Sequence, residues 1–132
     1  MKVERFEDLI AWQKARGLNK TVYRLSTRQQ FQNDFSLIDQ MRRCSISIMS
    51  NIAEGFDRFR PTEFRQYLSI AKGSCAELRS QLYAAFDATY IEKQEFDRVY
   101  ADIVETARII GALRAAVEKR SRISRPSVAP ST

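Results

Sequence analysis

Apolar residues recur at alternating intervals of four and three, and this spacing constrains the fold more than any other feature of the chain. In the first stretch the apolar positions are Ala11, Ala15, Leu18, Val22 and Leu25. Such spacing places the side chains on one face of an α-helix. With three prolines and four glycines among 132 residues, long helices are rarely interrupted. The sequence predicts helices over residues 8–25, 35–56, 62–86 and 92–119.

Four amphipathic helices with mostly short connections bury their apolar stripes by packing side by side. We therefore predict an all-α fold, an antiparallel up-and-down four-helix bundle, as one domain over residues 1–120. Residues 121–132 are basic, rich in serine and proline and without apolar period, so a disordered tail is predicted there. That tail is either a solvated end or an additional nucleic-acid contact.

Local signals mark the ends and faces of the second helix. Asn33 or Asp34 is the expected N-cap, and Gly55 is expected to take part in the C-terminal cap. A polar stripe lies opposite the apolar one; it consists of Arg43, Ser47, Ser50, Asn51, Glu54 and Arg58. The small groups of this helix are expected to allow close packing, and Asn51 and Glu54 to satisfy polar groups of neighbouring elements.

The chain lacks the residues on which general-base catalysis, metal binding and phosphate-binding loops usually depend. The chain has no histidine, which is the commonest general base and a frequent metal ligand. Cys44 and Cys75 fall on apolar stripes without metal-ligand spacing, so they are expected to fill the core. The four glycines are isolated and form no phosphate-binding loop. We therefore expect a protein that is not an enzyme and that uses no cofactor and no metal.

The chain also lacks signals for a membrane or for export. No apolar run approaches the roughly 18 residues of a membrane-spanning helix. The first residues, MKVERFEDL, lack the apolar segment of a signal peptide. A cytoplasmic location without a membrane partner is expected.

The net charge of +6 favours an anionic partner. The candidate nucleic-acid contacts are Arg42, Arg43, Arg58, Arg60 and Arg65. Guanidinium groups suit phosphate contacts, and RNA and DNA are both open. Acidic residues are interleaved with these arginines, so a mixed solvated surface is the alternative.

A ridge of small residues runs along the back of the third expected helix, where charged residues are usual on a solvated face. It is formed by Ser69, Gly73, Ala76 and Ser80, and the second helix adds a flank of Ile46, Met49 and Ala53. Because small side chains let another helix approach closely, these seven residues predict an interface of a homo-oligomer. A structural, self-assembling scaffold without a nucleic-acid ligand therefore stays a second hypothesis.

Three blocks of the sequence resemble the 23S ribosomal RNA intervening-sequence protein family, also called four-helix bundle proteins. The blocks are FEDLIAWQKARGLNKTVYRL, LIDQMRRCSISIMSNIAEGFDR and EFRQYLSIAKGSCAELRSQLYAA. The family pattern I-R-R-A-x-x-S-I-P-x-N-I-A-E-G-x-x-R is met at Arg42, Arg43, Ser47, Ile48, Asn51, Ile52, Ala53, Glu54, Gly55 and Arg58. Cys44 replaces its alanine, and Met49 replaces its proline.

This resemblance implies an antiparallel four-helix bundle that assembles as a homopentamer. The family is also similar in fold to the accessory protein of diversity-generating retroelements, a basic pentamer that binds nucleic acid and a reverse transcriptase. For this chain we expect a non-enzymatic, self-assembling bundle that binds nucleic acid through arginine-rich surfaces.

Overall fold

The computed structural model of the chain describes residues 3–58 and 60–124, with side chains described as far as residue 120. Within these ranges the chain forms helices and no strand, which confirms the all-α fold. The elements are the short 3-10 helices η1 (Phe6–Asp8) and η2 (Gln29–Phe31), and the α-helices α1 (Ile10–Ser26), α2 (Phe35–Asp57), α3 (Pro61–Asp87) and α4 (Lys93–Ser124).

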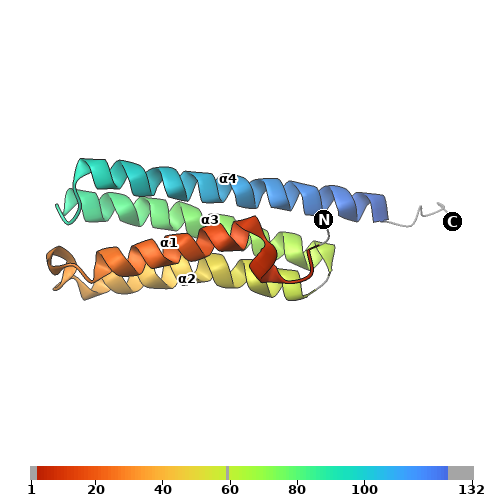
Figure 1. Cartoon of the computed structure of the whole chain (residues 1–132), viewed down its shortest axis with the longest axis horizontal. Helices are drawn as coiled ribbons and strands as arrows, with labels where there is room; N and C mark the ends of the chain where they lie inside the picture. Colours follow the sequence, from red (N-terminus) through yellow and green to blue (C-terminus); the bar gives the residue numbers. More distant parts are fainter. Residues whose placement is uncertain (1–2, 59, 125–132) are drawn as a thin grey trace.

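The four α-helices lie side by side along one long axis (Figure 1). Each packs against the next in the chain, and α4 also packs against α1, so the ring of helices is closed. Because short connections join consecutive helices, neighbours run in opposite directions. This confirms the predicted up-and-down bundle and places α1 and α3 at opposite corners.

The core consists of the predicted stripes. All five apolar positions of the α1 stripe are buried, and they meet Met41, Ile48 and Ile52 of α2. The other two helices complete the core with Leu68, Ala71, Cys75, Leu78, Leu82, Phe96, Val99, Ile103 and Ile110. Phe31 of η2 is also fully buried, so the connection between α1 and α2 folds back onto the core.

The start of α2 is capped as predicted. The backbone N–H of Leu37 donates to the Asp34 carboxylate at 3.1 Å, and the Tyr90 hydroxyl donates to the other carboxylate oxygen at 2.9 Å. Asp34 therefore caps α2 and also ties it to the connection that leads into α4.

Gly55 does not end α2, although its carbonyl accepts the capping N–H of Arg58 at 3.3 Å. The helix continues to Asp57, and no glycine in the described residues has a positive φ. A Cβ atom built on Gly55 would lie 2.6 Å from the Cβ of Tyr67 and 3.0 Å from a ring carbon of Phe64. Gly55 is therefore required by the close approach of α3.

α4 continues to Ser124, so the predicted domain boundary at residue 120 falls inside this helix. The sequence explains the length, because Pro126 is the first proline or glycine after Gly111. The rest of the predicted tail, 125–132, lies outside the described residues. Across residues 3–58 and 60–124, none of the helices combines the length and apolar character that crossing a bilayer requires.

Candidate nucleic-acid interface and assembly face

The five predicted arginines do not form one site. Arg42 and Arg43 lie in the first half of α2, whereas Arg58, Arg60 and Arg65 surround the turn between α2 and α3. Fifteen residues separate Arg43 from Arg58, which is roughly 22 Å along a helix. The two groups therefore have to be considered separately.

Arg58 is held by acidic and aromatic neighbours. Its guanidinium forms ion pairs with Glu54 at 3.0 Å and Glu63 at 3.8 Å, and it lies 5.5 Å from the centroid of the Tyr67 ring. The hydrogen bond to Glu54 raises the pKa of the Arg58 guanidinium. Glu54 also accepts a hydrogen bond from the Tyr67 hydroxyl at 3.1 Å. Arg58 thus belongs to the packing of α2 on α3, and its charge is largely compensated.

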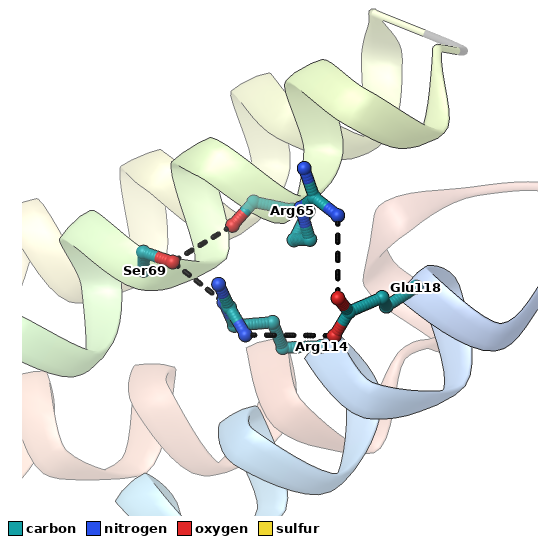
Figure 2. Close-up of polar contacts among 4 residues, drawn as sticks. All are labelled: Arg65, Ser69, Arg114 and Glu118. Carbon is teal, nitrogen blue, oxygen red and sulfur yellow. Dashed lines mark hydrogen bonds and ion pairs between the residues drawn. The ribbon is translucent and has the colours of Figure 1, made fainter. Parts of the chain in front are cut away.

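Arg65 is part of the contact between α3 and α4 (Figure 2). It lies 3.5 Å from the carboxylate of Glu118, which also attracts Arg114 at 3.9 Å. Arg114 donates to the hydroxyl of Ser69 at 2.6 Å, and that hydroxyl donates to the backbone carbonyl of Arg65 at 3.1 Å. These four side chains link two helices, so Arg65 is not a free cation.

The remaining predicted arginines differ in their surroundings. Arg43 is exposed and pairs with Asp39 at 2.9 Å. Arg60 is exposed and makes no ion pair with the described residues; it borders an apolar cavity of about 660 Å³ at this end of the bundle. Arg42 is half-buried: its Nε donates to the Ser26 hydroxyl at 2.9 Å, and its guanidinium lies 4.5 Å from the centroid of the Tyr23 ring. Both partners are neutral, so no carboxylate of the described residues compensates the charge of Arg42.

A cationic surface on α1 was missed at the sequence level. Between Asp8 and Asp34 the chain has no acidic residue, and α1 carries Lys14, Arg16, Lys20 and Arg24. Lys14 lies 3.9 Å from Glu105 of α4, whereas Arg16, Lys20 and Arg24 are exposed and have no ion-pair partner within the described part of the chain. The signal was the acid-free segment 9–33 itself.

The predicted assembly residues lie on two helices, α2 and α3, and most of them are exposed. Those on α3 begin at Ser69, which contacts Arg114 of α4, whereas those on α2 lie on the side that contacts α1 through Arg42 and Ser45. Those on α3 are all exposed: Ser69, Gly73, Ala76 and Ser80. On α2, the Ile46 side chain is 41% exposed, Ala53 is half-buried, and Met49 packs against the edge of the core. Ile70, 52% exposed and three residues before Gly73, belongs to the same region and was not predicted.

Part of the polar stripe of α2 lies between α2 and α3. The hydroxyl groups of Ser47 and Ser74 are 2.9 Å apart, and the Cys44 thiol donates to the backbone carbonyl of Ser74 at 3.0 Å. Burial raises the pKa of the Cys44 thiol to about 12 and that of the Cys75 thiol to about 11. Both cysteines are free and buried, as expected of core residues. The small polar groups of α2 therefore serve close helix packing.

One polar atom in this region is unsatisfied. The side-chain oxygen of Gln81 is buried and has no hydrogen-bond partner among the described residues. Gln81 borders a cavity of about 420 Å³ between α2 and α3, together with Gln40, Arg43, Cys44, Ser47, Ser74 and Glu77. A buried amide oxygen without a donor lowers stability.

Comparisons with known proteins agree with this fold. The family model described as 23S rRNA-intervening sequence protein matches residues 7–112, which is most of the chain. A crystal structure of a protein of unknown function from the S23 ribosomal protein family of Bacteroides thetaiotaomicron is similar, with a TM-score of 0.74 and 19% identity. The similarity covers 80% of this chain and 96% of that chain, and at this identity it shows the fold alone. Among curated proteins, none matches the sequence.

Proposed function

Because the chain belongs to the 23S rRNA-intervening sequence protein family, we propose that it is a cytoplasmic, self-assembling helical bundle that binds nucleic acid. It acts in this proposal without enzymatic activity, cofactor or metal. Its two functional parts are an assembly face on α2 and α3 and arginine-rich surfaces that contact phosphates.

The observation that carries the proposal is the exposed small-residue face of α3. A Cβ atom on Gly73 would meet nothing within 4 Å, so no internal contact requires a glycine there. A glycine in a helix interior lowers stability by about 1 kcal/mol relative to alanine. Exposed Ile70, three residues before Gly73 on the same helix, adds apolar surface beside it, and Ile46 is an exposed apolar residue of α2. A helix of a second copy would bury this face, and the family resemblance suggests five copies.

Assembly turns weak phosphate contacts into multivalent binding. A ring of identical subunits repeats each cation around an axis, so each subunit needs to contribute only modestly. With a net charge of +6 per chain, a polyanionic partner is favoured. Contacts to phosphates alone make binding weakly sequence-selective and strongly dependent on salt.

The second candidate is a structural scaffold without a nucleic-acid ligand. It is favoured by the carboxylates that face the predicted arginines: Asp39 beside Arg43, Glu54 and Glu63 beside Arg58, and Glu118 beside Arg65. An arginine already paired with a carboxylate has less to gain from a phosphate.

The experiment measures mass and nucleic-acid binding on the same sample. Light scattering at micromolar concentration should give a multiple of 15.3 kDa. Gel-shift or anisotropy assays at ~50 mM salt should detect binding of single-stranded RNA, single-stranded DNA or duplex, because phosphate contacts are strong there. A monomer would contradict the assembly face. An oligomer without any nucleic-acid binding would favour the scaffold.

A further inference from the structure

The solvent face of α1 carries a row of cations with no carboxylate on the same helix. Arg16, Lys20 and Arg24 are spaced by four residues, so they share one face at intervals of about 6 Å and span about 12 Å. All three are exposed. Two acids of α4 pair with other cations of the acid-free segment 9–33, Glu105 with Lys14 and Glu95 with Arg28. Within the described residues, none of the three cations of the row forms an ion pair.

Aromatic rings position Arg16 of this row and Arg42 beside it. Arg42 lies 4.5 Å from the ring centroid of Tyr23 and is also held by Ser26, whose hydroxyl donates in turn to the carbonyl of Tyr23 at 3.1 Å. Arg16 lies 5.7 Å from the ring centroid of Trp12. A ring orients a guanidinium without neutralising it, whereas a carboxylate does both. Less side-chain freedom is then lost when these arginines contact a phosphate.

A glycine lies within the same surface. Gly17 is exposed in the interior of α1, and a Cβ atom there would meet nothing within 4 Å. Since no internal contact requires it, Gly17 lowers helix stability by about 1 kcal/mol without a compensating gain in packing. The absence of a side chain between Arg16 and Lys20 lets an extended ligand come close to the helix.

We infer that this α1 face, with Arg16, Lys20, Arg24 and Arg42, is the surface that binds the phosphodiester backbone of nucleic acid. This inference rests on the proposed function. It places the nucleic-acid site on α1 and not at the turn between α2 and α3. The ligand is a polyanion with regularly spaced phosphates, and the bases are not read. Four contacts predict that log K falls with log salt with a slope of about −3 for each α1 face that engages a single strand.

The test compares two triple variants of the full-length protein that lose the same charge. The site variant is Arg16→Gln, Lys20→Gln, Arg24→Gln, and the control is Arg43→Gln, Arg58→Gln, Arg60→Gln. Glutamine is a good helix former and all six positions are exposed, so both variants should keep the helix content and mass of the wild type, although the control also loses the ion pairs of Arg58 with Glu54 and Glu63. Circular dichroism and light scattering check this. Single-stranded RNA, single-stranded DNA and an RNA duplex of equal length are the probes.

The site variant should lose affinity by a factor on the order of 100 at ~0.1 M salt, with a salt slope shallower by about 2, because three contacts are removed. The control should change affinity by less than about threefold. An equal or larger loss in the control, with wild-type binding intact, overturns the inference but leaves the proposed function standing. If the wild type binds none of the probes, both fall. Anionic phospholipid vesicles are a fourth probe, and binding to them alone, lost in the site variant, overturns the inference and the proposed nucleic-acid binding together.

Discussion

Replacing Gly55 by alanine should destabilise the protein, although alanine is the better helix former. The added Cβ would lie 2.6 Å from the Cβ of Tyr67, 3.0 Å from a ring carbon of Phe64 and 3.3 Å from the Tyr67 Cγ. The Phe64 ring can rotate, but the Tyr67 Cβ moves only with the backbone of α3. The two helices therefore have to separate locally. Overpacking of this kind costs about 1–3 kcal/mol.

The same substitution at Gly17 provides the matched control. Both glycines lie inside helices, so alanine gains about 1 kcal/mol of helix propensity at either position. At Gly17 nothing opposes that gain, because the new Cβ has open space around it. We expect Gly17→Ala to raise the free energy of unfolding by about 1 kcal/mol and Gly55→Ala to lower it by about 1 kcal/mol.

Urea unfolding at equal protein concentration measures this difference of about 2 kcal/mol, because an oligomer's stability depends on concentration. In a chain of this size it corresponds to roughly 8 °C between the melting temperatures of the two variants. The effect of Gly55→Ala should persist in a Tyr67→Ala background, since alanine keeps the Cβ that causes the contact. If Gly55→Ala is as stable as Gly17→Ala, the close approach of α2 and α3 at Gly55 is wrong.

Three further predictions concern the interior and the assembly face. Gln81→Met should raise the free energy of unfolding by about 1 kcal/mol in urea titrations, because it removes an unsatisfied buried oxygen. The free energy of unfolding should fall as pH rises from 9 to about 12, because burial raises the pKa of Cys44 and the thiol therefore ionises first in the unfolded chain. Cys44→Ala should make this fall shallower in urea titrations at several pH values. Gly73→Glu should reduce the mass measured by light scattering while circular dichroism keeps the helix signal, because it adds bulk and charge to an open position.

The bundle was predictable from local information because each apolar stripe repeats over several helical turns. Periodicity of this kind fixes which side of a helix is buried, and short connections then fix which helices are neighbours. The cap formed by Asp34 was also predictable, since its hydrogen bond reaches only three residues along the chain. The stripes were predictable because they repeat over several turns, and the cap was predictable because its hydrogen bond joins residues close together in the chain.

The faces between the stripes were harder to assign, because a helix in a closed bundle packs against two neighbours. Ser47 lies opposite the apolar stripe in the sequence pattern, yet it meets Ser74 of α3. Gly55 was interpreted from its place near a helix end, whereas the deciding contact, with Tyr67, comes from another helix. Neither partner can be identified from periodicity within α2 alone.

Whether an arginine is available to a ligand also depends on carboxylates that are far away in the sequence. Arg43 with Asp39 and Arg58 with Glu54 are four residues apart, so these pairs were visible in the sequence. The pairing of Arg65 with Glu118 spans 53 residues and depends on the register of α3 against α4. A count of arginines therefore overestimates the charge available to a ligand. The acid-free segment 9–33 was the better signal, because a cation in a segment without acids has no partner nearby in the chain.

The arrangement of the helices separates the α3 part of the assembly face from the row on α1, whereas Ile46 on α2 lies one helical turn from Arg42. α1 and α3 occupy opposite corners of the bundle, so a second copy that covers Gly73 on α3 leaves the solvent face of α1 open. Every added subunit then adds one more row of Arg16, Lys20 and Arg24 to the assembly. Separate rows on one particle can engage the same polyanion, and effective concentration strengthens each later contact. Assembly through α3 and binding through α1 thus explain why a chain with a modest net charge would gain from forming an oligomer.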